Sequence, residues 1–396
     1  MFACAGTPSG FRPPFLFHGA CLALLLVLGT SWCRAEDVAF RRHVINAGSE
    51  FMAAAAFDVN KDGKLDIVCG GYWYEGPTWQ KHFLRNVEIK GGRPDGYAHQ
   101  VLDVNGDGWP DLVTVNWRTS SIKWLEHPGA NLAKGEEWKA HVIAVPGASE
   151  SGRLVDLLGD GTPALLPCGA GFAAWWELRR QPNPQGGFTP EWIKHELPRE
   201  LAGHGIGTGD INGDGRMDIV GHNGWAEAPL DRRTGRWIWH PDFELEQASI
   251  PILVVDVDGD GLNDIVYTHA HDYGVYWLQQ TRTKDNQIKW TKHTIDSSGA
   301  GAHAPLWEDL DGDGIKELVI GRRYLAHEGK DPGEFDPQSA YRYQFDPKIC
   351  LTRFPVPIRP RHFFERLPGH AFRLLVSGGD VPGQAAWSPR RLAQFR

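Results

Sequence analysis

The sequence predicts an all-β fold, a seven-bladed β-propeller, and three observations support this prediction. First, the nine-residue pattern Asp-x-Asn/Asp-x-Asp-Gly-x-x-Asp/Glu occurs five times, and a sixth copy keeps only its turn. Second, the first Asp residues of successive copies stand 45, 53, 54, 46 and 53 residues apart, which is the length of a four-stranded propeller blade. Third, a β-branched run follows most copies, as a buried strand requires.

The repeated pattern has the chemistry of a calcium-binding loop. Side-chain oxygens at positions one, three, five and nine, with a backbone carbonyl near position seven, supply the six or so ligands that Ca²⁺ needs. The glycine at position six permits the left-handed turn that folds these oxygens inward. Asp-Gly and Asn-Gly also form ordinary hairpin turns, but five intact copies favour structural Ca²⁺. The predicted ligands are Asp58, Asn60, Asp62, Asp66, Asp103, Asn105, Asp107, Asp111, Asp210, Asn212, Asp214, Asp218, Asp256, Asp258, Asp260, Asp264, Asp309, Asp311, Asp313 and Glu317.

The loops define the blades and their strands. They begin at residues 58, 103, 156, 210, 256 and 309, and the copy at Asp156 has lost two side-chain ligands. An aromatic strand follows each β-branched run, and a Trp-x-x-His pair marks an outer strand in five blades. Because this histidine recurs at one position in successive blades, we interpret it as architectural rather than catalytic. The histidines concerned are His82, His141, His195, His240 and His293.

The ends of the chain are expected to close the ring. Residues 40–45 look like an outer strand that lacks three strands before it, so this strand must complete a blade begun elsewhere. Pairing it with the C-terminal tail would also remove exposed sheet edges. Residues 355–396 then form a seventh, degenerate blade, because the turn near residue 375 has almost no ligands. A fault in the reading frame of this Arg- and Pro-rich tail is the alternative.

Residues 1–35 are typical of a secretory signal peptide. Arg12 precedes an apolar run over residues 15–28, and a small-residue cleavage site stands before Glu36. An uncleaved anchor is the alternative, but the run is short and interrupted. We therefore expect a secreted or periplasmic protein in which residues 36–396 form the propeller and contain no membrane span.

Charge and cysteine content narrow the functional classes. The formal net charge is −8, and much of the negative charge lies in the predicted loops. No basic stripe is present to neutralise phosphates, so nucleic acid is not an expected partner. Beyond the predicted signal peptide, Cys69, Cys168 and Cys350 are too few and too scattered for a disulfide framework.

The face opposite the loops is the expected place for a functional site. The innermost strand of each blade starts there and the second strand ends there, so polar residues at these positions should converge near the axis. Histidines beside Tyr and Arg would bind a transition metal such as Zn²⁺ or remove a proton beside a carbonyl, although each could equally be a buried structural group. The residues expected to line this pocket are His204, Asn223, His271, Asp272, Tyr273, His303, Arg322, Tyr324 and His327.

Three tryptophans lie near the same mouth of the predicted channel. Trp117, Trp225 and Trp307 could offer stacking faces to sugar rings. They could equally pack in the core, since the chain contains 17 Trp. The sequence leaves both interpretations open.

The loops and strands over residues 40 to about 350 resemble the FG-GAP/VCBS repeat family, the calcium-loop propellers of integrin alpha-chains and many secreted bacterial proteins. More narrowly, residues 203–207 with 223–225, 270–274, and 321–327 with 331–333 look like the propeller of the aldos-2-ulose dehydratase/isomerase family. This second resemblance implies a carbon–oxygen lyase that removes water from an oxidised sugar. The candidate catalytic residues are His204, His271, His303, Tyr273 and Arg322.

Three classes of function remain open on this evidence. The first is a secreted, carbohydrate-directed lyase in which His204, His271 or His303 moves protons and Arg322 stabilises an enolate. The second is a non-catalytic binding or adhesion module, possessing a cell-surface partner, as many members of the repeat family are. The third is a propeller with a purely architectural role.

Overall fold

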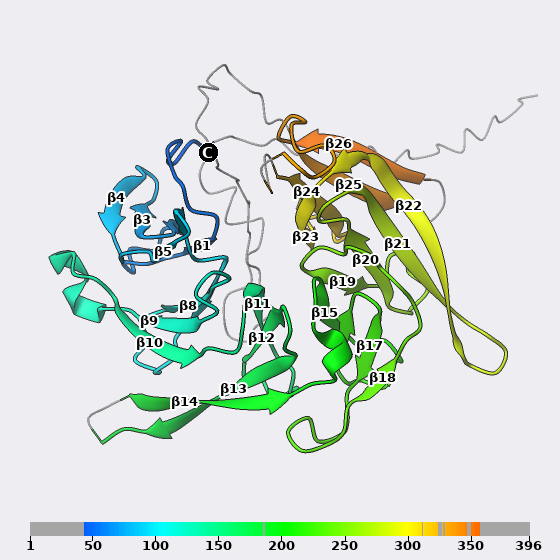
Figure 1. Cartoon of the computed structure of the whole chain (residues 1–396), viewed down its shortest axis with the longest axis horizontal. Coiled ribbons are helices and arrows are strands. Elements are labelled where there is room, and N and C mark those ends of the chain that lie inside the picture. The colour runs from blue at the N-terminus through cyan, green and yellow to red at the C-terminus, as the bar shows by residue number, and fades with distance from the viewer. Residues whose placement is uncertain are drawn as a thin grey trace, which may run out of the picture. The chain divides into compact units, whose positions relative to one another are not determined.

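Antiparallel strands make up nearly all of the regular structure. A computed structural model describes residues 43–356, apart from 185–186, 311, 324–326, 328 and 347–349. The strands form four-stranded meanders in which sequential strands pair, and the first strand of each meander lies nearest the centre in Figure 1 while the last lies at the rim. This propeller-like arrangement confirms the all-β prediction.

Three meanders are built from the first half of the described chain. Their strands follow one another through short turns, and the loops between the first two strands are the predicted calcium loops. The bounds are β1 (Ala54–Phe57), β2 (Asp66–Cys69), β3 (Tyr72–Glu75) and β4 (Gln80–Phe83); β7 (Ala98–Leu102), β8 (Asp111–Val115), β9 (Ile122–Glu126) and β10 (Lys139–Ala144); β11 (Ser149–Val155), β12 (Ala164–Gly169), β13 (Ala174–Pro182) and β14 (Phe188–Glu196). A small hairpin, β5 (Ile89–Lys90) with β6 (Arg93–Pro94), precedes β7, and two 3-10 helices are η1 (Gly129–Lys134) and η2 (Arg199–Leu201).

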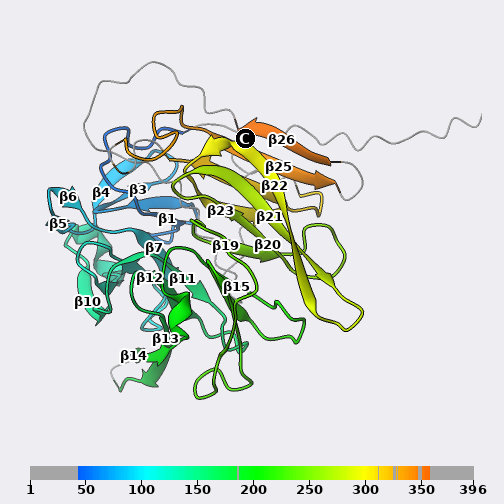
Figure 2. The same ribbon diagram turned by 45° about the vertical axis from the view of Figure 1, so that its right-hand side comes forward.

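Three further meanders follow, which makes six within the described residues. The hairpin of β21 and β22 is the longest and extends well beyond its neighbours (Figures 1 and 2). The bounds are β15 (Ile206–Gly209), β16 (Asp218–Gly221), β17 (Gly224–Glu227) and β18 (Ile238–His240); β19 (Ile252–Val255), β20 (Asp264–Thr268), β21 (Tyr273–Arg282) and β22 (Ile288–Ala300); β23 (Ala302–Glu308), β24 (Glu317–Arg322), β25 (Ala340–Asp346) and β26 (Cys350–Val356).

We refer to these meanders as blades one to six in chain order. The predicted seventh blade is not confirmed, because residues 357–396 lie outside the described part of the chain, and residues 355–356 belong to β26 of blade six. The predicted signal peptide also lies outside it. Of the predicted closing strand at 40–45, only residues 43–45 are described, and they belong to no sheet. Seven blades and ring closure therefore stay predictions.

Blades four and five are joined directly through their innermost strands. β15 and β19 pair in parallel, with Gly207 opposite Ile252, which merges the two meanders into one eight-stranded sheet. A Cβ at Gly207 would lie 2.1 Å from the carbonyl oxygen of Ile252, so only glycine permits this approach.

The hydrophobic core consists of layers between consecutive blades. One layer packs Leu157 and Trp175 of blade three against Ile219 of blade four, and all three side chains are fully buried. Four equivalent clusters fill the other interfaces from blade one to blade six. This arrangement follows from the sequence pattern, because a strand with β-branched residues on both faces must be covered on both faces.

The recurring outer-strand histidines are architectural, as predicted. In blade one His82 stacks on Trp73 with ring centroids 4.1 Å apart and contacts Glu75 at 3.0 Å. The same pair of contacts recurs in blades two to five, with Gln279 replacing the glutamate in blade five. These contacts lie within a blade, on its third and fourth strands, rather than between blades.

Within the described residues, no helix is long and apolar enough to cross a membrane.

Candidate functional site

The predicted calcium loops adopt one conformation, which the first Asp organises. In the first loop, the Asp58 carboxylate accepts the N–H groups of Asp62 at 3.0 Å and Gly63 at 2.8 Å. The equivalent contacts recur in later loops, including the incomplete one, where Asp156 holds Gly161 at 3.1 Å. Gly63 has a φ of 83°, in the left-handed region that the position-six glycine was predicted to supply.

The ninth residue of each intact loop is fully buried and performs a structural role. Its carboxylate accepts the N–H of the position-two residue at 2.8–3.1 Å. In four loops its second oxygen accepts an N–H from within the third strand or just beyond its end, at 2.7–2.8 Å, while Glu317 instead contacts Arg342 at 3.0 Å. The residues concerned are Asp66, Asp111, Asp218, Asp264 and Glu317.

Oxygen ligands suited to Ca²⁺ are present in these loops. The carboxylates of Asp256, Asp258 and Asp260 offer oxygens within 4.8 Å of one another, which is compact enough for one cation after small adjustments. Two other loops contain their own cation, since Lys64 contacts Asp62 at 2.7 Å and Arg216 contacts Asp214. Asp311 lies outside the described residues. Calcium binding therefore stays a prediction, with the loop at Asp256 as its best candidate.

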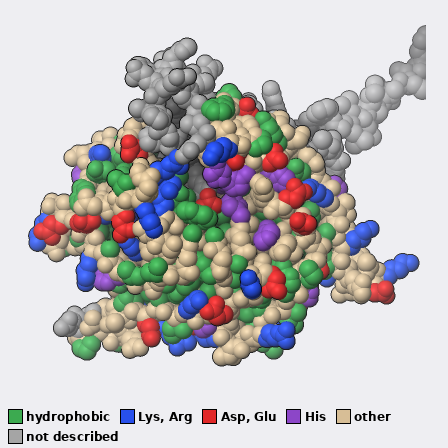
Figure 3. Space-filling view, viewed as in Figure 1, with side chains coloured by type: hydrophobic (Ala, Val, Ile, Leu, Met, Phe, Trp, Pro, Cys, Tyr) green, Lys and Arg blue, Asp and Glu red, His purple; other side chains and the backbone are tan. Residues whose placement is uncertain are grey.

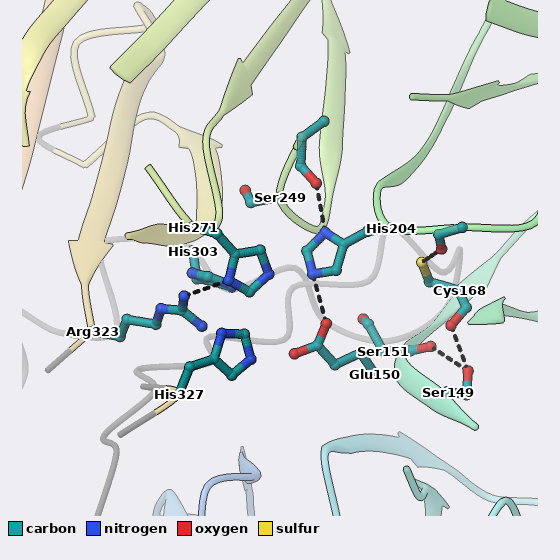
Figure 4. Close-up of polar contacts among 12 residues, drawn as sticks. Ser149, Glu150, Ser151, Cys168, His204, Ser249, His271, His303, Arg323 and His327 are labelled. Carbon is teal, nitrogen blue, oxygen red and sulfur yellow. Dashed lines mark hydrogen bonds and ion pairs between the residues drawn. The ribbon is translucent and has the colours of Figure 1, made fainter. Parts of the chain in front are cut away.

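A second cluster lies at the opposite ends of the innermost strands, and we call it the axial site. It consists of Glu150 in β11, His204 before β15, His271 after β20, and His303 in β23. Figure 4 shows these side chains around one space, with His327 and Arg323 beside them. Figure 3 shows histidines gathered by a hollow near the centre of one face, with Lys and Arg side chains to their left.

The histidines of the axial site lie close to one another. The ring centroid of His204 is 5.0 Å from that of His271 and 6.2 Å from that of His303, and the remaining pair is 6.0 Å apart. Glu150, His204 and His303 offer ligand atoms within 4.8 Å of one another. The structure thus brings together the three histidines that the sequence selected and adds a carboxylate.

Each of these histidines has its Nδ1 engaged by an oxygen. His204 Nδ1 donates to the carbonyl of Ala248 at 2.7 Å, and His303 Nδ1 donates to that of Gly301 at 3.2 Å. In a neutral ring this leaves the lone pair on Nε2. Nε2 of His204 lies 2.7 Å from a carboxylate oxygen of Glu150. This separation is that of a hydrogen bond, so a proton lies between the two atoms.

His271 is held by a carboxylate rather than by the backbone. Its Nδ1 lies 2.9 Å from Asp331 and 2.6 Å from Arg323 Nη2, and one neutral tautomer cannot satisfy both contacts. We assign the Nδ1 proton to the Asp331 bond, because a carboxylate is the stronger acceptor and Arg323 also donates to it. Burial lowers the pKa of His271, the hydrogen bond to Asp331 raises it, and the positive charge of Arg323 lowers it again; the net effect is a lowered pKa, so the ring is neutral near pH 7.

Asp331 lies on a non-repeated segment between β24 and β25 and accepts hydrogen bonds from several side chains. Its carboxylate contacts His327 at 3.0 Å, and the ring of His327 stacks on His271 with centroids 4.6 Å apart. Burial alone would raise the pKa of Asp331, but hydrogen bonds from His271 and His327 outweigh this effect and lower it. Asp331 is therefore an ionised residue that orients His271.

Other predicted site residues have different roles. Arg322 contacts Asp336 at 2.7 Å, and the Tyr273 hydroxyl donates to the same carboxylate at 3.2 Å. Arg322 and Tyr273 therefore interact with Asp336 rather than with the three histidines. Asp272 accepts the N–H of Tyr273 at 2.7 Å. Asn223 follows β16, and Tyr324 lies outside the described residues.

The three tryptophans predicted to lie near the mouth differ in position and exposure. Trp225 is buried and stacks on His240 at 4.2 Å. Trp307 is half-buried at the loop end of β23, away from the mouth, and packs on Phe345 at 5.3 Å. Trp117 remains 38% exposed. Among these three, stacking on a ligand at the mouth therefore fits Trp117.

Glu150 was missed by reasoning from the sequence, although a signal for it exists. Glu150, His204 and His303 each stand six residues before the first Asp of their loops, at Asp156, Asp210 and Asp309 (156 − 150, 210 − 204 and 309 − 303). This shared spacing is the signal, because it places the glutamate at the same strand position as the two histidines.

Comparisons with known proteins support the fold. A family model described as an FG-GAP-like repeat matches residues 256–320, which contain the loop at Asp256 and most of β24. No curated protein matches the sequence. This repeat and the propeller-like arrangement together support the FG-GAP β-propeller family.

Similar solved structures include rhamnogalacturonan lyase YesW, with a TM-score of 0.39 and 11% identity over 78% of this chain and 65% of that chain. Another is the V. cholerae biofilm matrix protein Bap1, with a TM-score of 0.28 and 12% identity over 74% of this chain and 62% of that one. The chain thus spans slightly less than two thirds of either structure. Neither similarity is strong enough to indicate an activity.

Proposed function

We propose that the axial site is a metal-binding centre that acts on a carbohydrate as a carbon–oxygen lyase. Glu150, His204 and His303 would hold a divalent transition-metal ion such as Zn²⁺, and His271 would serve as the base. The observation that carries the proposal is the convergence of three histidines and one carboxylate, with each Nδ1 engaged by an oxygen.

The donor set suits a transition metal better than Ca²⁺. Imidazole nitrogen with one carboxylate oxygen is typical of zinc and related ions, whereas Ca²⁺ prefers oxygen alone. Backbone or carboxylate acceptors on the far nitrogen are the usual means of orienting metal-binding histidines. A bound ion would replace the proton between His204 Nε2 and Glu150, and these two atoms would move slightly apart to hold it. When bound, the ion would polarise a carbonyl oxygen and thereby acidify the neighbouring C–H bond.

His271 is suited to remove that proton. Its lowered pKa leaves it neutral near pH 7, and Asp331 on Nδ1 directs the basic lone pair to Nε2. In the proposed elimination, Nε2 takes the proton and the C–H electron pair forms a C=C bond. The C–O bond of the adjacent carbon breaks, and its oxygen leaves as water after gaining the proton that His271 took up, which returns the imidazole to its neutral form. No oxidant or reductant is consumed.

The resemblance to the aldos-2-ulose dehydratase/isomerase propeller supports an oxidised sugar as the substrate. His204, His271 and His303 fit such a role, and they lie together. Arg322 and Tyr273 would act indirectly, by holding Asp336 and the segment that carries Asp331. In this proposal the protein is exported and its calcium loops stabilise the scaffold.

Metal analysis and a direct assay test the proposal. The purified protein, freed of metal and reloaded with Zn²⁺, should bind close to one ion per chain at the axial site, and His204→Ala should lose it. Anhydrofructose and glucosone are the substrates to try, with enone absorbance as the readout and His271→Ala as the inactive variant. Silence of both wild type and His271→Ala with both sugars would reject the lyase.

A non-catalytic binding module is the alternative outcome of the same experiments. Glycan binding that survives simultaneous loss of His204, His271 and His303 would favour it. His240→Ala is a matched control, because this histidine belongs to an outer strand and pairs with Glu227.

A further inference from the structure

We infer that Trp117 and Tyr97 form a stacking subsite for a second sugar ring beside the axial site, so that the ligand is an oligosaccharide rather than a free monosaccharide. This inference rests on the proposed carbohydrate function of the axial site. The two aromatic residues belong to blade two, which contributes no histidine to the axial site.

Tyr97 occupies the blade-two equivalent of an axial-site position. It stands six residues before Asp103 (103 − 97), as Glu150, His204 and His303 stand before their own loops. Its N–H donates to the carbonyl of Val115 at 2.9 Å, which fixes it at the start of the innermost strand. Blade two therefore presents an aromatic ring where blades three, four and six present a carboxylate and two imidazoles.

Trp117 and Glu150 lie at the mouth end of two adjacent blades. Blades two and three touch where Gly152 of β11 meets Val115 of β8, since a Cβ on Gly152 would lie 2.5 Å from the Val115 side chain. From this contact Glu150 is two residues towards the mouth along β11, and Trp117 is two residues beyond Val115 at the end of β8. Two residues of chain span at most about 7 Å, so both residues lie close to this contact on its mouth side.

The loop that carries Trp117 is held rigidly. The Asp95 carboxylate, which is only 4% exposed, accepts the N–H groups of Arg118 at 3.1 Å and Thr119 at 2.8 Å, and the Thr119 hydroxyl at 2.7 Å. Asn116 binds the carbonyl of Ser121 at 2.9 Å from the other side. A large aromatic side chain on a fixed loop loses little conformational entropy when a ligand stacks on it.

The two rings form an open, tilted platform. Their ring centroids are 6.3 Å apart, the interplanar angle is 37°, and Trp117 is 38% exposed to solvent. The apolar C–H face of a sugar ring can stack on an indole, while its hydroxyls face polar neighbours. Lys90 Nζ, which donates to the Arg118 carbonyl at 2.8 Å, marks the polar border of this platform. The Lys and Arg side chains beside the histidines make an acidic sugar a reasonable probe (Figure 3).

Calorimetry with matched sugars tests the inference on the full purified protein. The probes are tetragalacturonate and cellotetraose, each compared with its own monosaccharide. We expect at least one tetrasaccharide to bind about tenfold more tightly than its monosaccharide, as one stacking contact would give. Trp117→Ala should remove this gain without changing monosaccharide binding, and Trp117→Phe should keep part of it.

Phe188→Ala is the control, because Phe188 is 40% exposed but lies on β14, an outer strand. Equal affinity for tetrasaccharide and monosaccharide, absence of binding to any probe, or an unchanged gain in Trp117→Ala would each overturn the inference. The proposed function is tested separately, because it is rejected if the protein does not bind Zn²⁺. A Trp117-dependent gain in tetrasaccharide affinity that persists in His204→Ala would still support the stacking subsite.

Discussion

Replacing Asp218 by alanine separates two roles that one carboxylate of a calcium loop can have. The sequence makes Asp218 a calcium ligand. In the structure it is fully buried, and its two oxygens accept the N–H of Ile211 at 2.9 Å and the N–H of Ala228 at 2.8 Å. The carbonyl of Ile211 in turn accepts from Gln280 of blade five at 3.1 Å. Asp218 thus organises a loop that also connects two blades.

The expected cost follows from these two bonds. A hydrogen bond to a charged acceptor contributes about 1.5–3 kcal/mol, so losing both should lower the free energy of unfolding by about 3–6 kcal/mol. Asp218→Asn should cost roughly half as much, because the amide oxygen can still accept one N–H. Asp214→Ala, at the exposed fifth position of the same loop, should cost under about 1 kcal/mol once calcium is absent.

Urea denaturation in excess chelator provides the measurement. Burial raises the pKa of Asp218 to about 7, so the assay should be run at about pH 8.5, where the carboxylate is ionised. With an m-value of about 3 kcal/mol/M, the midpoint of Asp218→Ala should fall by about 1–2 M. Equal midpoints for wild type and Asp218→Ala in chelator would refute the reasoning, because the carboxylate would then stabilise the fold only through calcium.

Three further predictions concern calcium, pH and the outer strands. Chelation of calcium should lower the melting temperature of the wild type, since a ligand at a hundred times its Kd stabilises the folded state by about 2.7 kcal/mol. Asp256→Ala should reduce the effect of the chelator on the melting temperature, whereas Asp156→Ala should not. Identical melting temperatures with and without chelator would contradict this prediction. Burial and then the charge of Arg85 lower the pKa of His99 to about 3, so below about pH 6.5 the unfolded chain binds a proton at this residue and the folded chain does not. The free energy of unfolding of the wild type, relative to that of His99→Phe, should therefore fall by about 2–3 kcal/mol between pH 7.5 and 4.5. A difference that stays constant with pH in calorimetry would show that His99 does not cause the pH dependence. His240→Ala, which loses the stack on Trp225, should cost about 1–2 kcal/mol in urea melts yet leave metal content unchanged, and a loss of metal would show that this histidine is not merely architectural.

The six described blades could be predicted from the sequence because the same nine-residue loop pattern recurs along the chain. In four loops the first and ninth residues bind backbone groups of that loop and of the chain at the third strand, so spacing in the sequence translates directly into strand register. The outer-strand histidines were likewise recognisable from their recurrence. Their actual partners, a tryptophan and a glutamate on the third strand, were not, because strand pairing rather than spacing determines them.

The axial site was only partly predictable for the same reason. His204 and His303 hold a repeated position, so topology was enough to bring them together. Asp331 and Arg323 belong to the segment between β24 and β25, which has no counterpart in the other blades and no periodicity. Tyr273 and Arg322 were predicted to line the site, but the contact of both with Asp336 could not be inferred from chain position.

The two ends of each blade are under different constraints, and this explains how one repeat can carry a particular chemistry. At the loop end, a side chain of the next blade binds the position-two carbonyl: His127 binds Val59 at 3.0 Å, and Arg180 binds Val104 at 2.9 Å. A substitution there disturbs two blades together. At the mouth, the position six residues before each loop holds five different residue types in six blades, Met52, Tyr97, Glu150, His204, Ile250 and His303. Because the loop geometry does not depend on these side chains, the mouth can change its chemistry while the loops preserve the fold.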